Sequence, residues 1–558
     1  MESAPFERLL ARLPSPRSPR FFAVFLLTAM ACWGEPGARG AATPADAVGA
    51  PPAEGTDEAE PVAAPSPPPT PLPPDPASSA TPTSVPRPAA APGSLAGRLT
   101  PLVDALSTWV KTHHADLSLA VRDLGTGREL CDDGAARALN PASNAKLITA
   151  AVALSELGPK FRFHVGVLGK IEDGVAPRLV LRGNGDPSFS YEDLKGFAER
   201  LVALGLKRVD GGILVDQSAF DDTYTPPAFE QQPGEWSVFR APVSAVALER
   251  NTTTLHVYPT EAGELARVEF EPPGYVSVQG EVRTETSKKR EHVGLTLKPR
   301  GLLLGAQVSG GIPEGKTVLH ASKRIENPEI YAGVVLARVL TSLGVDVKGE
   351  AKRGGEDESV ELVGRDSLEL AELTQQLGKA SDNFYAETLF KALGAFKRGK
   401  PGTAENAARV EVDWLKNRQI GDEGLRISNG SGLYDANRVS ARTFTRVLEA
   451  AYLDPSISRS YVAQLAVGGV DGTLRSRFLP LRGRPAVHAK TGTLNKVTSL
   501  SGYVFGPDEA TSVAFSILIS GTTDHAGARQ RMDALVLEIA DSLWASARSS
   551  TSMALARR

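Results

Sequence analysis

The sequence predicts a mixed α/β protein in which a strand-rich region is inserted into a larger, helix-rich one. Helical apolar spacing is present in residues 102–112 and 147–157, and it returns only after about residue 328. Between about 161 and 320, short β-type runs alternate with turn signals such as the Gly-Asn-Gly-Asp-Pro segment that begins at Gly183. The length of 558 residues corresponds to roughly two to four domains.

Each region has its own set of expected elements. In the strand-rich region we expect one helix, over 191–204, and strands over 163–168, 179–181, 212–216, 253–258 and 268–271. Beyond it we expect helices over 328–343, 368–376, 382–394, 404–417 and 441–453. The chain is then expected to form strands over 486–490, 499–505 and 511–519 and an amphipathic helix over 528–545.

Charge and composition exclude several classes of partner. The chain has 62 basic and 65 acidic residues, and its net charge of −3 leaves no broad basic field of the kind that binds nucleic acid. Its two cysteines, Cys32 and Cys131, are too few for a disulfide framework. No HExxH or CxxC spacing is present, so we expect neither a metal nor an organic cofactor.

The N-terminal segment, residues 1–32, has the features of an export signal. Arginines precede an apolar run, Phe21–Ala31, which is too short to span a bilayer. The run ends in an Ala-Met-Ala cleavage pattern, and Cys32 follows directly, as in bacterial lipoprotein signals, although Ala29 stands where those usually have leucine. Lipidation of Cys32 and plain cleavage both stay open. In either case we expect an exported protein, periplasmic or at the outer surface, with a lipid anchor as one option.

A segment rich in proline and alanine, residues 33–94, separates this signal from the folded sequence. It has almost no large apolar residues and therefore cannot offset the entropy of ordering itself. Proline at this density favours an extended, semi-rigid tether. We expect a disordered linker here and a flexible tail over residues 548–558.

The first motif with catalytic chemistry is the S-x-x-K spacing of Ser143 and Lys146. Asn140 is a favourable N-cap and Pro141 suits the first helical position, so both side chains are expected on one face of a buried helix start. A serine hydroxyl is a weak nucleophile unless a base takes its proton, and a lysine kept neutral by burial or by nearby cations can do so. Backbone N–H groups at such a helix start are available to an oxyanion.

Two further motifs follow in the chain. An S-D-N, Ser381–Asn383, opens an expected helix, and a K-T-G, Lys490–Gly492, ends a strand-like run. Each motif alone is weak, because S-D-N is an ordinary helix cap, K-T-G an ordinary turn, and S-x-x-K a spacing that chance produces. In the order S-x-x-K, S-x-N, K-T-G they match the three-part signature of penicillin-binding proteins and β-lactamases.

With these motifs the chain resembles the class C low-molecular-mass penicillin-binding proteins, the D-alanyl-D-alanine carboxypeptidase/endopeptidase family. The resemblance runs from about Leu99 to Ala547. The long interval between Lys146 and Ser381 is similar to that of this family, which inserts extra domains there, whereas ordinary β-lactamases are far shorter. Segments similar to those of the family are also found at 183–187, 216–220, 241–245, 428–433 and 469–474.

The resemblance implies a fold with a penicillin-binding, β-lactamase-like core, in which helices flank an antiparallel sheet. This catalytic domain would comprise residues 95–160 and 321–547. One or two inserted β-rich domains would occupy residues 161–320.

The resemblance also implies catalytic roles for the motif residues. Ser143 would be the acylated nucleophile, and Lys146 the base that activates it. Ser381 would relay a proton to the leaving amine, with Lys490 on the same side of the cleft. Asn383 would form a hydrogen bond to the amide backbone of the substrate.

Substrate binding is assigned by the same resemblance to the K-T-G strand. Lys490, Thr491 and Thr493 would hold the terminal carboxylate of D-alanine or the acid group of a β-lactam, with Gly492 between the two threonines. The backbone N–H groups of Ser143 and Thr493 would form the oxyanion hole. A site of this kind requires no cofactor and no metal.

The implied activity is that of a serine-type D-Ala-D-Ala carboxypeptidase or endopeptidase that acts on peptidoglycan stem peptides and is inhibited by β-lactams. One departure bears on substrate preference and rate. The family usually has aspartate before Gly-Ser-Gly-Leu and Ser-Arg after it, whereas this chain has Asn429 before and Tyr434–Arg438 after.

Three alternatives stay open on the sequence. The first is another serine hydrolase on the same core, either a β-lactamase or an esterase. The second is a non-catalytic scaffold that binds the cell wall, and the third is a sensor that is acylated but hardly turns over. Covalent labelling by a penicillin separates the scaffold from the others, and the rate of release excludes an efficient β-lactamase.

Overall fold

The computed structural model describes residues 93–355, 360–507 and 511–556. The predicted export signal, Cys32 and the predicted linker up to residue 92 lie outside the described residues. None of the helices in the described ranges combines the length and the apolar character needed to cross a membrane.

The core of the fold is a six-stranded antiparallel sheet with the order β19-β20-β21-β22-β1-β2. Its central contact joins the two ends of the folded chain, because β1 pairs with β22 along its whole length. The strands are β1 (Asp116–Asp123), β2 (Glu129–Asp133), β19 (Ala466–Val467), β20 (Val487–Leu494), β21 (Val497–Phe505) and β22 (Ser512–Ser520). This arrangement confirms the antiparallel sheet flanked by helices that the resemblance predicts.

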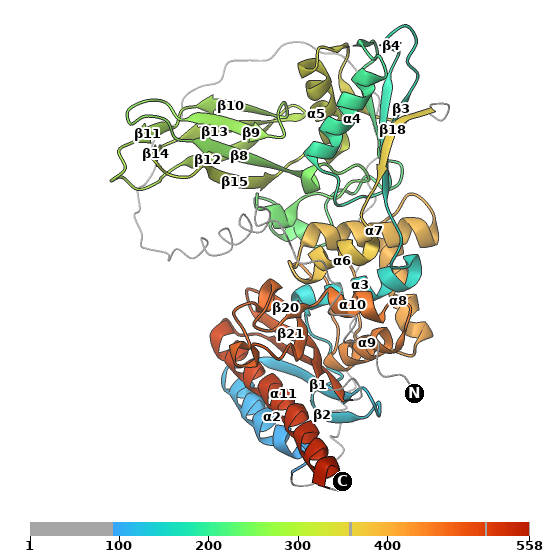
Figure 1. The fold of residues 1–558 in the computed structure, drawn as a ribbon, viewed down its shortest axis with the longest axis vertical. Coiled ribbons are helices and arrows are strands. Elements are labelled where there is room, and N and C mark those ends of the chain that lie inside the picture. The colour runs from blue at the N-terminus through green and yellow to red at the C-terminus, as the bar shows by residue number, and fades with distance from the viewer. Residues whose placement is uncertain (1–92, 356–359, 508–510, 557–558) are drawn as a thin grey trace, which may run out of the picture. The chain divides into compact units, whose positions relative to one another are not determined.

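Alternating side chains of β22 face two different hydrophobic layers, as the two-residue period of a strand requires. Phe515 and Ile517 pack in the layer formed with α2 (Leu95–Thr112) and α11 (His525–Ala556), which lie side by side (Figure 1). Ala514 and Leu518 face the opposite layer, which contains α9 (Ala441–Leu453).

The last helix differs from the expectation at its C-terminal end. The sequence predicts a helix that ends at about residue 545 and a tail over 548–558, but α11 continues to Ala556. Serine and threonine are moderate helix formers, and extending an existing helix needs no new nucleation, so the preceding turns carry the helix onward.

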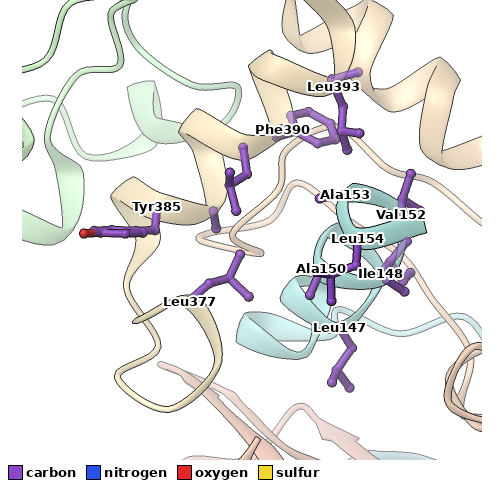
Figure 2. Close-up of a cluster of buried hydrophobic side chains, with 14 of the residues drawn as sticks. Leu147, Ile148, Ala150, Val152, Ala153, Leu154, Leu377, Tyr385, Phe390 and Leu393 are labelled. Carbon is purple, nitrogen blue, oxygen red and sulfur yellow. The ribbon is translucent and has the colours of Figure 1, made fainter. Parts of the chain in front are cut away.

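The second layer is built around α3 (Lys146–Leu157), whose residues from Lys146 to Leu154 are all buried. Figure 2 shows its apolar side chains beside those of α7, including Leu147, Val152 and Phe390. The surrounding helices are α6 (Leu370–Gly378), α7 (Asn383–Arg398), α8 (Ala404–Asn417) and α10 (Ser458–Ala463). A helix that is apolar on every side is stable only inside such a cluster, which explains the uninterrupted apolar run in the sequence.

The inserted part has its own hydrophobic core. Its largest sheet has the order β17-β7-β5-β3-β18, with β3 (His164–Gly169), β5 (Leu179–Gly183), β7 (Ile213–Asp216), β17 (Ala351–Arg353) and β18 (Val360–Asp366). The helix α5 (Pro328–Ser342) packs against β7, β17 and α4 (Tyr191–Ala203). Packing therefore groups residues up to Asp366 with the insert, whereas the sequence placed its end near residue 320, because sequence alone does not show which sheet a late strand joins.

The remaining strands of the insert form small sheets. One has the order β15-β8-β9, another β10-β13-β12, and β11 pairs with β14. Their bounds are β8 (Thr252–Tyr258), β9 (Arg267–Glu271), β10 (Val276–Gly280), β11 (Arg283–Glu285), β12 (Gly294–Arg300), β13 (Leu303–Ser309), β14 (Gly311–Pro313) and β15 (Leu319–Arg324). Short strands β4 (Val175–Ala176), β6 (Arg208–Val209) and β16 (Asp346–Val347) form a further sheet.

Candidate active site

Ser143 lies on a 3-10 turn, η1 (Ala142–Ala145), that leads into α3. The expectation of a regular helix start at Pro141 is wrong, because Ala142 has a φ of 47° and the α-helix begins only at Lys146. Asn140 does support the turn, since its Oδ1 accepts a hydrogen bond from the N–H of Ala142 at 2.9 Å. A left-handed alanine is a strained conformation that the surrounding structure must hold in place, and such residues are frequent at active sites.

The ammonium group of Lys146 connects the nucleophile to two other segments. Its Nζ is 3.0 Å from Ser143 Oγ, 2.7 Å from Asn383 Oδ1 and 2.8 Å from the carbonyl oxygen of Ser431. Lys146 has no exposed surface, whereas Ser143 is partly exposed. The serine hydroxyl is therefore accessible to a ligand, and the base behind it is shielded from water.

Burial sets the charge state of Lys146. Desolvation lowers its pKa to about 7, and the carboxylates of Glu387 and Asp382 oppose this shift without cancelling it. At neutral pH a large fraction of Lys146 is then an uncharged amine, the form that can accept a proton from a hydroxyl.

Glu387, which the sequence analysis did not single out, holds the loop that contacts Lys146. This buried carboxylate accepts hydrogen bonds from the backbone N–H groups of Ser431 (2.8 Å) and Gly430 (3.2 Å). Burial raises its pKa, while those bonds and Lys146 act in the other direction. The signal for Glu387 was present in the sequence, because it is one helical turn after Asn383 within an otherwise apolar run.

The second motif meets the third through Ser381 and Lys490. Lys490 Nζ donates to Ser381 Oγ at 2.7 Å and to the carbonyl oxygen of Thr491 at 2.8 Å. Ser381 has a φ of 59°, a second strained position beside the cleft. Lys490 is fully buried, and desolvation, together with the nearby charge of Lys146, lowers its pKa well below the usual range.

Asn383 joins the catalytic layer to the insert. Its Oδ1 accepts from Lys146, and its Nδ2 donates to the carbonyl oxygen of Phe239 at 3.1 Å, on the 3-10 turn η3 (Val238–Arg240). Nearby, Arg250 of the insert forms a 3.2 Å ion pair with Asp382 of the same motif. The insert therefore forms one wall of the site, which spacing along the sequence did not reveal.

The K-T-G strand offers an unoccupied edge to a ligand. In the described part of the chain, β19 pairs with β20 only at His488 and Ala489, so the same edge has no strand partner from Lys490 onward. Gly492 permits the close approach of η1, because a side chain there would collide with Ser499 Oγ and Ala142. Thr491 Oγ1 donates to Thr473 Oγ1 at 2.9 Å.

The loop that departs from the family pattern is held by amide side chains. Asn429 Oδ1 accepts from the N–H of Gly432 at 2.9 Å, and its Nδ2 donates to the carbonyl oxygen of Pro227 at 2.9 Å. Asn437 Oδ1 accepts from the N–H of Ser428 at 2.8 Å. Tyr434 packs edge to face against Phe229 of the insert, with ring centroids 5.8 Å apart. These changes therefore alter the contact between loop and insert, and they replace none of the groups around Ser143.

The structure thus brings the five predicted catalytic residues into one connected site. Ser143, Lys146 and Asn383 are linked through one ammonium nitrogen, and Ser381 and Lys490 through another. Among the residues that the structure describes, no group of three or more His, Cys, Asp or Glu side chains could hold a metal ion.

This arrangement of three motifs around a buried lysine and an accessible serine agrees with a sequence match over most of the chain. The profile of the D-Ala-D-Ala carboxypeptidase 3 (S13) family matches residues 103–542. The chain belongs to the S13 family. The family resemblance inferred from the three motifs is therefore confirmed, and the chain is a serine-type D-Ala-D-Ala carboxypeptidase, a hydrolase.

Two S13 relatives and one solved structure define the similarity. The D-alanyl-D-alanine carboxypeptidase of Actinomadura sp. (strain R39) is 32% identical over 455 residues, which are 78% of this chain and 83% of the relative. The D-alanyl-D-alanine carboxypeptidase DacB of Haemophilus influenzae is 24% identical over 421 residues, 73% of this chain and 86% of the relative. The crystal structure of penicillin binding protein 4 (dacB) from H. influenzae has a TM-score of 0.65 at 23% identity, covers 78% of this chain and 97% of that one, and confirms the fold.

Proposed function

We propose that the carboxypeptidase reaction of this chain is acyl transfer through Ser143. Ser143 Oγ attacks the carbonyl carbon of the D-alanyl-D-alanine bond while Lys146 Nζ takes the hydroxyl proton. The tetrahedral intermediate then collapses, the C–N bond breaks, and D-alanine leaves after its nitrogen gains a proton. Water, deprotonated by Lys146, attacks the resulting ester and releases the shortened peptide together with Ser143.

One observation carries this proposal: the 3.0 Å contact between Ser143 Oγ and a buried amine whose pKa is lowered to about 7. A lysine with its ordinary pKa is protonated at neutral pH and cannot act as a base. A serine within hydrogen-bond distance of a neutral amine has both the geometry and the proton acceptor that nucleophilic catalysis requires.

Ser381 supplies the path by which the leaving nitrogen gains its proton. Its hydroxyl accepts a hydrogen bond from Lys490 Nζ at 2.7 Å and can donate its own proton toward the cleft. The cation of Lys490 stabilises negative charge on Ser381 Oγ during the transfer, and Lys146 then returns the proton to Ser381.

The free edge of β20 positions the substrate. An extended peptide that pairs with this edge places its carbonyl carbon near Ser143, and Asn383 contributes hydrogen bonds to the peptide backbone. Thr491, Gly492 and Thr493 lie along the peptide, and the backbone N–H groups of Ser143 and Thr493 donate to the oxyanion. The absence of a side chain at Gly492 keeps η1 and β20 close enough for both donors to serve one oxygen.

The substrates of this proposal are peptidoglycan stem peptides, and β-lactams are its inhibitors. Support comes from the fold of H. influenzae penicillin binding protein 4, which has also been solved in complex with a β-lactam and has a TM-score of 0.61 in that form. Endopeptidase cleavage uses the same steps when a cross-linked stem is the leaving group. Such substrates are outside the cytoplasm, in agreement with the export signal that the N-terminal sequence predicts, and a lipid on Cys32 would tether the enzyme.

The experiment that tests this assignment is intact-protein mass spectrometry with benzylpenicillin. We expect the wild type to gain the mass of one penicillin, and Ser143→Ala to gain none. Ser155→Ala, on the distal end of the same helix, is the matched control and should label as the wild type does. A folded wild type without an adduct at any early time point would overturn the nucleophile assignment and leave a non-catalytic scaffold.

A further inference from the structure

Recognition of the substrate's terminal carboxylate requires a cation that the carboxylate can reach. This inference rests on the proposed acyl-transfer site, in which Lys490, Thr491 and Thr493 bind that carboxylate. Lys490 does not meet the requirement by itself, because it is fully buried and its ammonium group already donates to Ser381 Oγ and to the carbonyl oxygen of Thr491. Its charge acts through the strand, and it leaves room for an accessible donor at the mouth of the site.

Arg529 is a cation at this position. It lies in the first turns of α11, and its Nη2 is 3.4 Å from the Oγ1 of Thr493. Both side chains belong to exposed residues. Thr491 and Thr493 are two residues apart on β20, so their side chains share the face of the strand that Arg529 approaches.

No carboxylate neutralises Arg529. Among the described residues, no acidic side chain forms an ion pair with its guanidinium. The nearest acid along the helix, Asp533, is instead bonded to Arg477, whose Nε lies 3.2 Å from Asp533 Oδ1 and 3.3 Å from Oδ2. The next arginine of the helix, Arg531, lies over the ring of Trp109 at 4.9 Å. Arg529 is thus the arginine of this turn whose charge is left for a ligand.

We propose that Arg529 binds the C-terminal carboxylate of the substrate together with the hydroxyl groups of Thr493 and Thr491. A guanidinium presents two parallel N–H donors that match the two oxygens of a carboxylate, a geometry that an ammonium lacks. The contact selects peptides with a free C-terminus, and it accounts for how a buried Lys490 and an exposed arginine share one anion. Arg529 is therefore a specificity-determining residue of the carboxypeptidase reaction.

The test compares ligands with and without the carboxylate in the full-length protein. The second-order rate constant of acylation is measured with benzylpenicillin and with its methyl ester, for the wild type and for Arg529→Gln. We expect the variant to acylate about tenfold more slowly with benzylpenicillin, the loss typical of a charge-assisted hydrogen bond. With the ester the change should be less than about twofold, and Arg529→Lys should recover part of the loss.

Two controls make the outcome decisive. Lys496→Gln removes an equally exposed cation from the turn after β20 and should leave the ratio of the two rate constants unchanged. Equal losses with the acid and the ester, or no loss with either, would overturn the role of Arg529. Failure of the wild type to form any adduct on Ser143 would instead reject the proposed acyl-transfer site, so the two failures are distinguishable.

Discussion

The insert and the catalytic layer each bury charged side chains, but they treat those charges differently. In the insert, Arg365 lies between two aspartates: its Nη2 is 2.9 Å from Asp186, and it also forms an ion pair with Asp193. Both aspartates receive further hydrogen bonds, Asp186 from Ser188 and Asp193 from Ser190. Each charge in this cluster faces an opposite charge.

In the catalytic layer, the two buried lysines face oxygen atoms that are mostly neutral. Lys146 contacts a hydroxyl, an amide oxygen and a carbonyl oxygen, and Lys490 contacts a hydroxyl and a carbonyl oxygen. The carboxylate of Glu387 acts on Lys146 only through space and through the Ser431 loop. As a result, burial lowers the pKa of both lysines.

The difference shows what each region gains from a buried charge. Removing one member of a paired cluster leaves an unpaired charge inside the protein, so the cluster in the insert stabilises the fold. An unneutralised lysine costs stability but is available as a base near neutral pH. Substitutions in the two regions are therefore expected to separate stability from activity.

The largest expected effect is on catalysis. Lys146→Met removes the base and should slow acylation by benzylpenicillin about a thousandfold, the upper part of the range for general-base catalysis. Lys146→Met is compared with Lys391→Met, which removes another buried lysine, one that is paired with Asp221. The second variant should lose stability but keep its acylation rate in the folded fraction. Equal rates for Lys146→Met and the wild type would remove Lys146 from the mechanism.

The next effect is on stability alone. Arg365→Met leaves Asp186, whose side chain is fully buried, without its cation, and should lower the free energy of unfolding by about 3–5 kcal/mol. Arg353→Met, which breaks an exposed ion pair with Asp222 on a neighbouring strand, should cost less than about 1 kcal/mol. Denaturant unfolding measures both values. A similar cost for the two variants would show that the buried cluster is no more stabilising than a surface pair.

A third effect joins stability to pH. Because the pKa of Lys146 falls from 10.5 to about 7 on folding, the unfolded chain binds an extra proton between these values. The wild type should therefore become more stable relative to Lys146→Met as the pH rises through this window, by about 2 kcal/mol between pH 7 and 9. Below pH 7 the difference should be constant. A difference that stays flat from pH 7 to 10 would mean that Lys146 keeps an ordinary pKa in the folded protein.

The smallest effect concerns the pH profile of the reaction. Glu387→Gln removes the carboxylate that raises the pKa of Lys146, so that pKa should fall further. The acid limb of kcat/KM should then move to lower pH by about one unit. The midpoint is the readout, because the amide also weakens the bonds to Gly430 and Ser431 and reduces the maximal rate. Glu405→Gln, at an exposed position of α8, should leave the midpoint in place, and a shift to higher pH in Glu387→Gln would contradict the assignment.

The sequence supported the catalytic residues because their signal is local. Ser143 and Lys146 are one helical turn apart, and Ser381 and Asn383 flank a helix cap, so short-range geometry fixes each pair. The start of α3 was misplaced for the same reason, since the left-handed Ala142 is held by contacts with distant segments rather than by its neighbours. Likewise, β17 and β18 were not assigned to the insert, because their partners β7 and β3 lie far away in the sequence.

By itself, the sequence determined which chemical groups the protein has and the order in which the chain presents them: a serine with a lysine, a second serine with an asparagine, and a lysine-threonine-glycine strand. Only the tertiary structure decided their states. Burial among packed helices makes Lys146 a base, and the same burial removes Lys490 from the surface and leaves Arg529 of a distant helix beside Thr493. The physical reason is that desolvation and proximity depend on which segments pack together, and those contacts join residues hundreds of positions apart.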